Sequence, residues 1–346
     1  MRSFDGGELV PTLPYWAEVH AMPESKRLGD AELDALLEKL RRIEDGTYRE
    51  DGKWPDPERV ALYGGISGIV IDVPEFLICD GLVVRETFAH VMAPYIMAFA
   101  KPSKRGAPHP PPWKAASGGL GFDVTIEVAL AQSVRPISLD RINTLWWVLA
   151  LLRLRTAAPL RMPVMSDIPF AAVVSSKSEP HLWTIEMPPR QIRLAQKATD
   201  RISSADLIWV RDHFQSGAAL LSVESFNRAL QTFDTAIWAH GLGSAVIMAW
   251  TALETMFRPG RTSITKRLGQ CVATYLYPAG SERDRCFNEA TILYEARGSV
   301  THDAQSPDVE HFFDTFDLAR RCFIKCIEAG HLPDADTLIG EWKRRA

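Results

Sequence analysis

Ser244 to Phe257 reads SAVIMAWTALETMF, and this stretch decides the fold of the C-terminal half of the chain. Its large apolar residues recur every three or four positions, at Ile247, Trp250, Leu253, Met256 and Phe257. This spacing puts them on one face of an α-helix, where they can pack into a core. Pro259 and Gly260 follow directly and are typical of the end of a helix.

The same periodicity extends outward from this helix. We expect further helices over residues 222–239, 263–277, 281–297 and 307–329. Ser281 and Asp284 resemble a capping box, which marks a helix start. Ser306 is the expected N-cap of the last of these helices, with Pro307 as its first residue and Gly330 at its end. Short connections between amphipathic helices predict an all-helical bundle.

The N-terminal half carries mixed signals. Apolar and β-branched runs predict strands over residues 60–73, 76–88, 122–130, 170–174 and 182–187. Residues 138–155 predict one helix with Ser138 as N-cap. Residues 101–114 contain five prolines and four Lys or Arg residues, which is typical of an exposed loop, although the basic side chains could contact phosphates. We therefore predict an α+β protein, with a mixed α/β domain over residues 1–190 and a helical bundle over residues 191–346.

Composition excludes several classes of protein. The 346 residues are 46% apolar and 24% charged, which is typical of globular proteins rather than collagen, coiled coils or disordered chains. A net charge of −4 gives no overall basic field for indiscriminate nucleic-acid binding. Five scattered cysteines do not form a disulfide framework or a zinc site. The most apolar stretch, Leu145 to Leu152, is too short to cross a bilayer, and no signal peptide is evident, so we expect a cytoplasmic protein without membrane contact.

Residues 293–303 read LYEARGSVTHD, and they hold the best candidates for chemistry. A guanidinium at Arg297 suits a phosphate, and an imidazole at His302 can carry protons near neutral pH. Positions five apart on a regular helix lie about 140° apart around its axis, so the two would not share a face. Because glycine is a poor helix former, we expect a bend at Gly298 that lets them converge.

This segment resembles the R-x4-H signature of HEPN domains. Trp250 to Phe257 is similar to the "aLE-x-hydrophobic-F" helix of their ApeA-like branch, and Leu293 to His302 is similar to its "lY-x-x-R-S-x-x-x-H-G" segment. The resemblance covers about residues 225–330. Two positions depart from the pattern: Gly298 stands where a small polar residue is usual, and Asp303 stands where glycine is common.

The resemblance implies a metal-independent endoribonuclease without a cofactor, with Arg297 and His302 as catalytic residues. It further implies a homodimer formed through the C-terminal bundle, because two copies would bring two histidines and two arginines to one cleft. The setting it implies is bacterial defence against phage by abortive infection, or a toxin. Host tRNA or mRNA would be the substrate, and the N-terminal domain would sense a phage-derived trigger or recognise the substrate.

Supporting roles are predicted for neighbouring residues, each with a structural alternative. Glu254 either orients Arg297 or forms a structural ion pair. Ser299 and Thr301 either bond phosphate oxygens or are small for steric reasons, and Asp303 places a carboxylate beside His302. The remaining candidates are Arg258 and Arg261, which either extend a phosphate path or lie in a solvated turn.

A second function stays open on the sequence. The helical bundle could bind RNA or a nucleotide, or hold a protein partner, without cutting. An arginine or histidine at a helix end also often serves only to pair with backbone carbonyls. Residues 241–346 carry 13 Lys or Arg against 14 Asp or Glu, which favours a small local site over a broad basic surface.

Overall fold

The computed structural model describes residues 56–100, 113–173, 175–176, 180–186, 201–239, 241–260, 262–302 and 307–344; over 92–100, 113–120 and 299–302 it describes the backbone alone. Intrachain contacts group Pro57–Phe88 with Val124–Ala346 in one compact unit, and the rest of the chain forms a second unit. The predicted boundary at residue 190 falls within residues 187–200, outside the described residues, and it stays a prediction.

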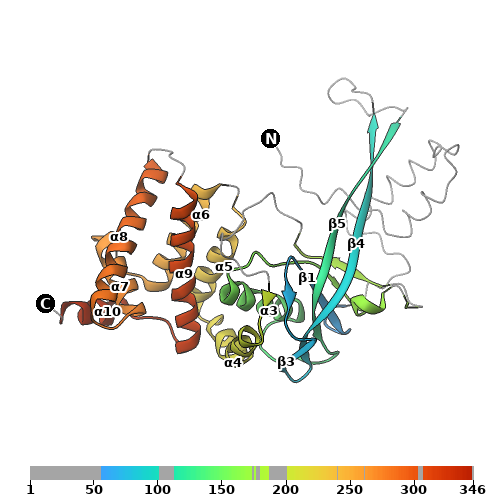
Figure 1. Cartoon of the computed structure of the whole chain (residues 1–346), viewed down its shortest axis with the longest axis horizontal. Helices are drawn as coiled ribbons and strands as arrows, with labels where there is room; N and C mark the ends of the chain where they lie inside the picture. The colour runs from blue at the N-terminus through green and yellow to red at the C-terminus, as the bar shows by residue number, and fades with distance from the viewer. Residues whose placement is uncertain are drawn as a thin grey trace. The chain divides into compact units, whose positions relative to one another are not determined.

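The N-terminal part contains an antiparallel sheet, and the C-terminal part is mostly helical, so the α+β prediction is confirmed (Figure 1). The strand order is β3-β4-β5-β1-β6-β7. The strands are β1 (Leu62–Ser67), β3 (Glu75–Cys79), β4 (Leu82–Ala100), β5 (Trp113–Leu130), β6 (Arg161–Ser166) and β7 (Leu182–Thr184). A separate parallel pair joins β2 (Val70–Ile71) to β8 (Arg201–Ile202).

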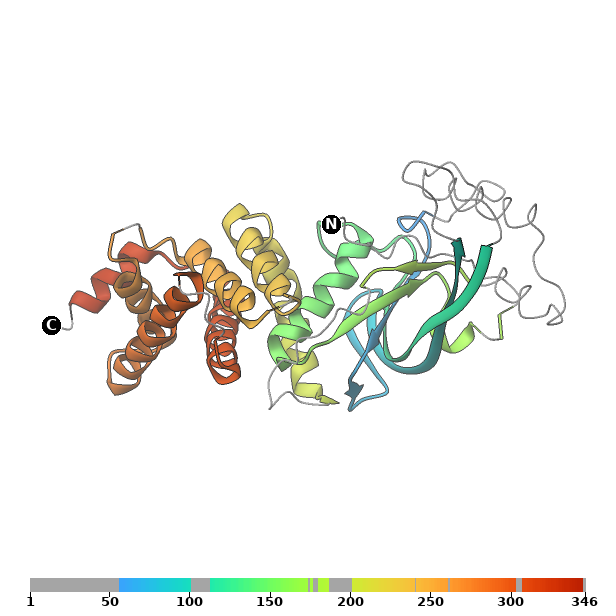
Figure 2. The same ribbon diagram turned by 90° about the horizontal axis from the view of Figure 1, so that it is seen from above.

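The described residues form eight α-helices. They are α3 (Arg141–Thr156), α4 (Ser204–Leu220), α5 (Glu224–Ala236), α6 (Leu242–Phe257), α7 (Ile264–Leu276), α8 (Ser281–His302), α9 (Val309–Ala329) and α10 (Ala335–Lys343). Helix α3 contacts β1 and β6 as well as α4 and α9, so it lies between the sheet and the remaining helices (Figure 2). No described helix is long and apolar enough to span a membrane.

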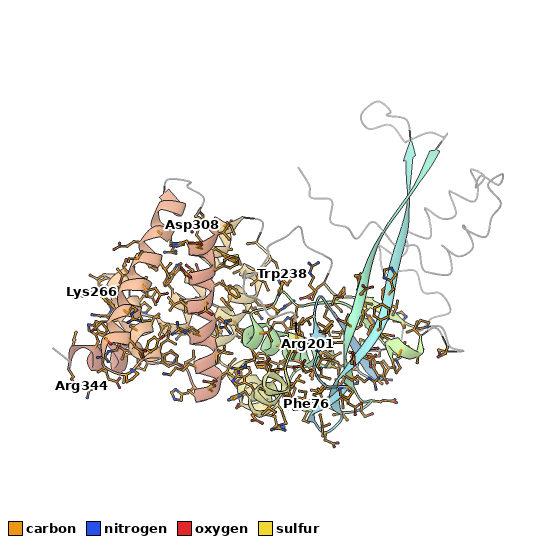
Figure 3. All side chains as sticks on the ribbon, in the orientation of Figure 1. Phe76, Arg201, Trp238, Lys266, Asp308 and Arg344 are labelled. Atoms are coloured by element: carbon orange, nitrogen blue, oxygen red, sulfur yellow. The ribbon has the colours of Figure 1, made fainter. Side chains whose placement is uncertain are left out.

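One cluster of buried apolar side chains runs from β1 to α10 (Figure 3). Trp147 on α3 is fully buried, and its indole Nε1 donates to the backbone oxygen of Phe214 on α4 at 2.9 Å. Arg141 at the start of α3 is 1% exposed, and its guanidinium donates to backbone carbonyls, among them those of Val60, Leu130 and Val134. These bonds satisfy the buried cation and tie α3 to the end of β5 and to the segments beside β1 and β5.

Three predicted helix starts were wrong. Asp140 caps α3 in place of Ser138, because its carboxylate accepts from the Asn143 N–H at 2.8 Å. Asp308 caps α9, so Pro307 lies before the helix and Ser306 lies outside the described residues. Ser281 is the first residue of α8 rather than its cap. The capping box lies instead at α4, a helix that the sequence reading missed, between Ser203 and Asp206.

Two strand predictions also need correction. The expected strand over 170–174 is a short 3-10 helix, Phe170–Ala172, which follows Pro169. Strand β6 was missed because Pro163 lies inside it. The register of β6 against β1 shifts at this point, between Gly65 and Ser67, so no ladder hydrogen bond is needed from the proline. Of the expected loop over 101–114, residues 113–114 belong to β5 and 101–112 lie outside the described residues.

Candidate functional site

Helices α6 and α8 contact one another and carry the central residues of the predicted site. Glu254 lies in the last turn of α6, which ends at Arg258 in a left-handed conformation with φ 52°. The Arg258 N–H donates back to the Glu254 carbonyl at 2.9 Å and closes that turn. On α8, Tyr294 and Arg297 are three residues apart, so both face α6.

The structure brings Glu254, Tyr294 and Arg297 into one contact cluster, called here the Arg297 cluster. Arg297 Nη1 lies 3.2 Å from Glu254 Oε1 and donates to the Tyr294 hydroxyl at 3.0 Å. The Tyr294 hydroxyl donates in turn to Glu254 Oε1 at 2.7 Å. The predicted contact between Glu254 and Arg297 is therefore present. Their side chains are 24% and 25% exposed, so the pair lies at the edge of the core.

The ring of Tyr294 also contacts the Arg297 guanidinium. It is 8% exposed, and its edge meets the buried ring of Trp250 with the ring centroids 5.0 Å apart. The Arg297 guanidinium lies over the ring face, 5.1 Å from the centroid. Burial and the hydrogen bond and charge of Glu254 raise the pKa of Tyr294 to about 12. The hydroxyl therefore keeps its proton at neutral pH and acts as a donor to Glu254.

The backbone of α8 runs through Gly298 to His302, so the expected bend is absent. Arg297 and His302 consequently occupy positions about 140° apart around one helix. A methyl group at Gly298 would meet nothing within 4 Å, so no packing contact requires glycine there. The side chains of Ser299, Thr301 and His302, together with residues Asp303 and Arg261, lie outside the described part of the chain, and their predicted roles stay predictions.

Arg258 is exposed and lies beside a different feature. It lines a groove of about 230 Å³, to which the Arg297 cluster contributes no residue. The other groove residues are Ser225, Met256, Phe257, Leu332, Pro333, Asp334, Ala335 and Asp336. Asp334 and Asp336 line the same groove, and Asp336 Oδ1 accepts from Arg267 Nη2 at 3.4 Å. Its predicted part in a phosphate path stays a prediction.

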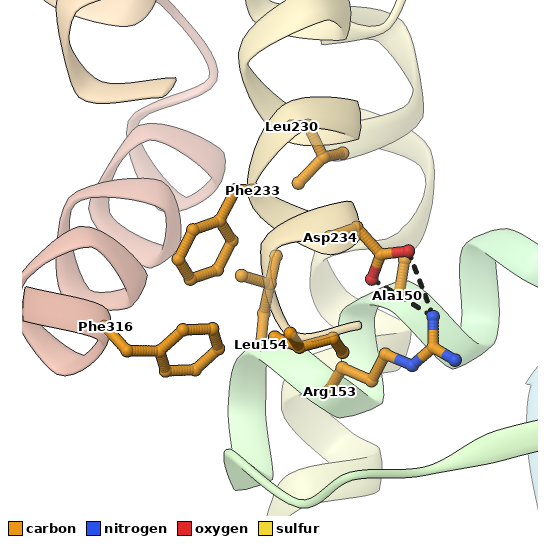
Figure 4. Close-up of a pocket in the computed structure, with 8 residues that line it drawn as sticks. Ala150, Arg153, Leu154, Leu230, Phe233, Asp234 and Phe316 are labelled. Atoms are coloured by element: carbon orange, nitrogen blue, oxygen red, sulfur yellow. Dashed lines mark hydrogen bonds and ion pairs between the residues drawn. The ribbon is translucent and has the colours of Figure 1, made fainter. Parts of the chain in front are cut away.

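A smaller cavity of about 10 Å³ lies between α3, α5 and α9 (Figure 4). At this size it holds one water molecule at most. Arg153 lies at its edge and donates from Nη1 to both oxygens of Asp234, at 3.0 and 3.1 Å. Its Nη2 donates to both oxygens of Glu186 at 2.8 Å, and its Nε donates to the Leu160 carbonyl. We call these side chains the Arg153 cluster.

Metal ligation finds no support among the described residues, where no three His, Cys, Asp or Glu side chains gather as a metal site would need. Cys322 and Cys326 lie four residues apart on α9, and both are completely buried with free thiols. Burial raises the pKa of the Cys326 thiol to about 12, so it carries no thiolate at neutral pH.

No protein-family model, curated protein or solved structure matches this chain. The site therefore has to be judged on its own geometry. Sequence reasoning missed the contact role of Tyr294. The signal was its position, three residues before Arg297 on the same helix, where side chains on one face meet.

Proposed function

We propose that the C-terminal helices form an ApeA-like HEPN bundle that cleaves RNA without a metal ion. The observation that carries this proposal is the Arg297 cluster: a partly exposed guanidinium, held from two sides, five positions before His302 on one helix. A cation fixed at the edge of a core suits the charge that develops on a phosphate during cleavage. The HEPN resemblance of residues 225–330 supplies the reaction class.

The proposed reaction uses the ribose 2′-hydroxyl of the substrate as nucleophile. His302 accepts the 2′-hydroxyl proton, and the 2′-oxygen forms a bond to the adjacent phosphorus. The bond from phosphorus to the 5′-oxygen breaks, and that oxygen takes a proton from a second histidine. The products are a 2′,3′-cyclic phosphate and a free 5′-hydroxyl. Arg297 stabilises the extra negative charge on the phosphate oxygens.

Two copies of the chain fit this reaction better than one. Because Arg297 and His302 lie about 140° apart around α8, neither face of the helix carries both catalytic groups. A homodimer through the bundle would combine the arginine of one copy with the histidine of the other, and would supply the second histidine. Ile292 on α8 is 64% exposed, which makes this helix a candidate for the dimer interface. If light scattering shows a strict monomer, and this monomer retains full RNA-cleaving activity, the dimer is refuted.

The biological setting stays part of the proposal. We place the protein in the bacterial cytoplasm, where it would cut host tRNA or mRNA during phage infection. Residues 1–190 would sense a phage-derived trigger or recognise the substrate. An active nuclease should slow the growth of cells that express it, and His302→Ala should relieve that effect.

Cleavage of labelled total RNA in EDTA tests the proposal. Wild type should cut, Arg297→Ala should lose about 10²–10³-fold in rate, and His302→Ala should lose about 10²–10⁴-fold. The alternative is a HEPN bundle that binds RNA, a nucleotide or a protein partner without cutting. The ion pair between Arg297 and Glu254 favours this alternative, because an ion pair that only stabilises the fold would have the same geometry. That alternative predicts RNA binding by wild type with no cleavage, and an Arg297→Ala variant that unfolds more easily.

A further inference from the structure

The hydroxyl of Tyr294 occupies a central position in the Arg297 cluster that the proposed reaction does not yet use. We infer that Tyr294 is a positioning residue, which fixes the guanidinium of Arg297 in the orientation that holds the phosphate. This inference rests on the proposed ribonuclease function. It assigns to Tyr294 no contact with RNA, only an effect through Arg297.

The contacts form a closed triangle. Arg297 Nη1 reaches both the Tyr294 hydroxyl, at 3.0 Å, and Glu254 Oε1, at 3.2 Å. The third side is the bond from the Tyr294 hydroxyl to Glu254 Oε1, at 2.7 Å. A hydroxyl has one proton to give and lone pairs to receive, so it can make both of its bonds at once. Each member therefore restricts the other two.

The ring of Tyr294 adds a second restraint. It lies under the guanidinium, and it is itself held by burial and by Trp250. Holding a long arginine side chain that is one-quarter exposed restricts its rotamer freedom. Together the hydroxyl and the ring hold one corner and one face of the guanidinium. Such preorganisation matters for a group that must meet charge developing on a phosphate, because misplacement by about 1 Å can cost 10²-fold in rate.

A second tyrosine–arginine pair in the same bundle provides a matched control. The Arg321 guanidinium lies 5.2 Å from the ring centroid of Tyr277, and its Nη2 donates to the Tyr277 hydroxyl. The chemistry is the same, but the pair joins α9 to the end of α7 and shares no residue with the Arg297 cluster. Within the described residues, no carboxylate bonds the Tyr277 hydroxyl. Loss of that hydroxyl should therefore leave cleavage unchanged.

The experiment compares Tyr294→Phe with Tyr277→Phe in the full chain. Phenylalanine keeps the ring and its packing while it removes the hydroxyl. We expect Tyr294→Phe to lower kcat for RNA cleavage about 10–100-fold with KM changed less than about twofold, because the charge of Arg297 still attracts phosphate. Its melting temperature should stay close to that of wild type. Tyr277→Phe should keep the wild-type kcat.

A second measurement does not depend on activity. Phenylglyoxal modifies accessible, unrestrained guanidinium groups, and mass spectrometry of the peptides reports each arginine separately. In Tyr294→Phe, Arg297 should be modified several times faster than in wild type, while the rate at Arg321 stays constant. An unchanged labelling rate at Arg297 would contradict the positioning role.

The outcomes separate this inference from the proposed function. If wild type does not cleave RNA, the ribonuclease proposal fails and the role of Tyr294 in it fails too. If wild type cleaves and Tyr294→Phe cleaves equally well, the ribonuclease stands and the inference alone is overturned. If Tyr294→Phe loses activity only because it unfolds, its melting temperature falls with its kcat, and a structural role replaces the positioning role.

Discussion

Arg153 and Arg297 have similar partners in two different places. Each contacts carboxylate oxygen, and each lies over an aromatic ring, with Arg153 5.0 Å from the Trp238 centroid and Arg297 5.1 Å from that of Tyr294. The surroundings differ. The Arg153 side chain is 5% exposed and bonds Asp234 (Figure 4), Glu186 and the Leu160 carbonyl. The Arg297 side chain is 25% exposed and contacts Glu254 and Tyr294.

Exposure and partners distinguish a structural guanidinium from a functional one, even though both residues are arginines. A buried guanidinium whose N–H groups are all engaged has lost its water and gains its stability from fixed partners. A partly exposed guanidinium such as that of Arg297 can meet a ligand dissolved in the solvent. We therefore expect loss of Arg153 to affect stability and loss of Arg297 to affect activity.

The largest expected effect on stability comes from Arg153→Met. Methionine fills a similar volume but leaves Asp234 and Glu186 without their shared cation, so the free energy of unfolding should fall by about 3–5 kcal/mol. Urea denaturation measures this loss. At a temperature where the variant is folded, its RNA cleavage should match that of wild type. A stable Arg153→Met that has lost cleavage would reverse the roles assigned to the two arginines.

The next largest effect on stability is expected from two helical glycines: Gly217 faces the core, and Gly298 follows Arg297 on α8. A methyl group at Gly217 would lie 2.9 Å from Trp147 Cζ2 and 3.2 Å from Ile327 Cγ2, so Gly217→Ala should cost about 1–3 kcal/mol. At Gly298 nothing lies within 4 Å, and Gly298→Ala should gain about 0.5–1 kcal/mol by favouring the helix.

The Gly298→Ala variant also tests the course of α8. Since the helix is continuous through this position, cleavage should be retained. Thermal unfolding and RNA cleavage of both glycine variants provide the measurement. A Gly298→Ala variant that is stable but inactive would show that the bend expected from the sequence forms during the reaction.

The smallest expected effect is a pH dependence of stability that comes from the Arg153 cluster. Burial raises the pKa of Asp234 above its ordinary value of 3.8; Arg153 opposes the shift, and the nearby Glu186 adds to it. The folded protein then binds more protons than the unfolded chain, so this contribution to stability is lost as pH rises from 3.8 through the folded pKa.

Urea denaturation between pH 4 and pH 7 checks this dependence. Asp234→Asn should flatten the decline of stability with rising pH, because asparagine does not ionise. Asp212→Asn, at an exposed carboxylate, provides the control for the loss of one negative charge. A steeper decline in Asp234→Asn would mean that its ionised form is the one stabilised by Arg153.

Helices α5 to α9 were predictable because apolar residues recur along them at helical spacing, whereas α4 and α10 were missed. Phe226, Leu230 and Phe233 of α5 are all buried as their spacing requires. The first residue of each helix was harder to predict, since several polar residues near each helix start could act as the N-cap. Asp140 outcompetes Ser138 only because its carboxylate reaches the Asn143 N–H once the helix has formed.

Other elements depend on tertiary contacts, which a local sequence pattern does not predict. Pro163 argues against a strand, and β6 forms because a register shift against β1 removes the need for its missing N–H. A contact between Glu254 and Arg297 was among the predictions from the sequence, whereas the triangle with Tyr294 depends on how α6 packs against α8. Helix α8 continues through Gly298 to His302 despite the low helix propensity of glycine.

The most direct test of the central claim is the rate of RNA cleavage in EDTA by Arg297→Ala beside Arg321→Ala. Both substitutions remove a guanidinium that lies over a tyrosine ring in the same bundle. We expect Arg297→Ala to lose at least about 10²-fold in rate, while Arg321→Ala, assayed where it is folded, cleaves like wild type. Equal rates for the two variants would contradict the catalytic role of Arg297.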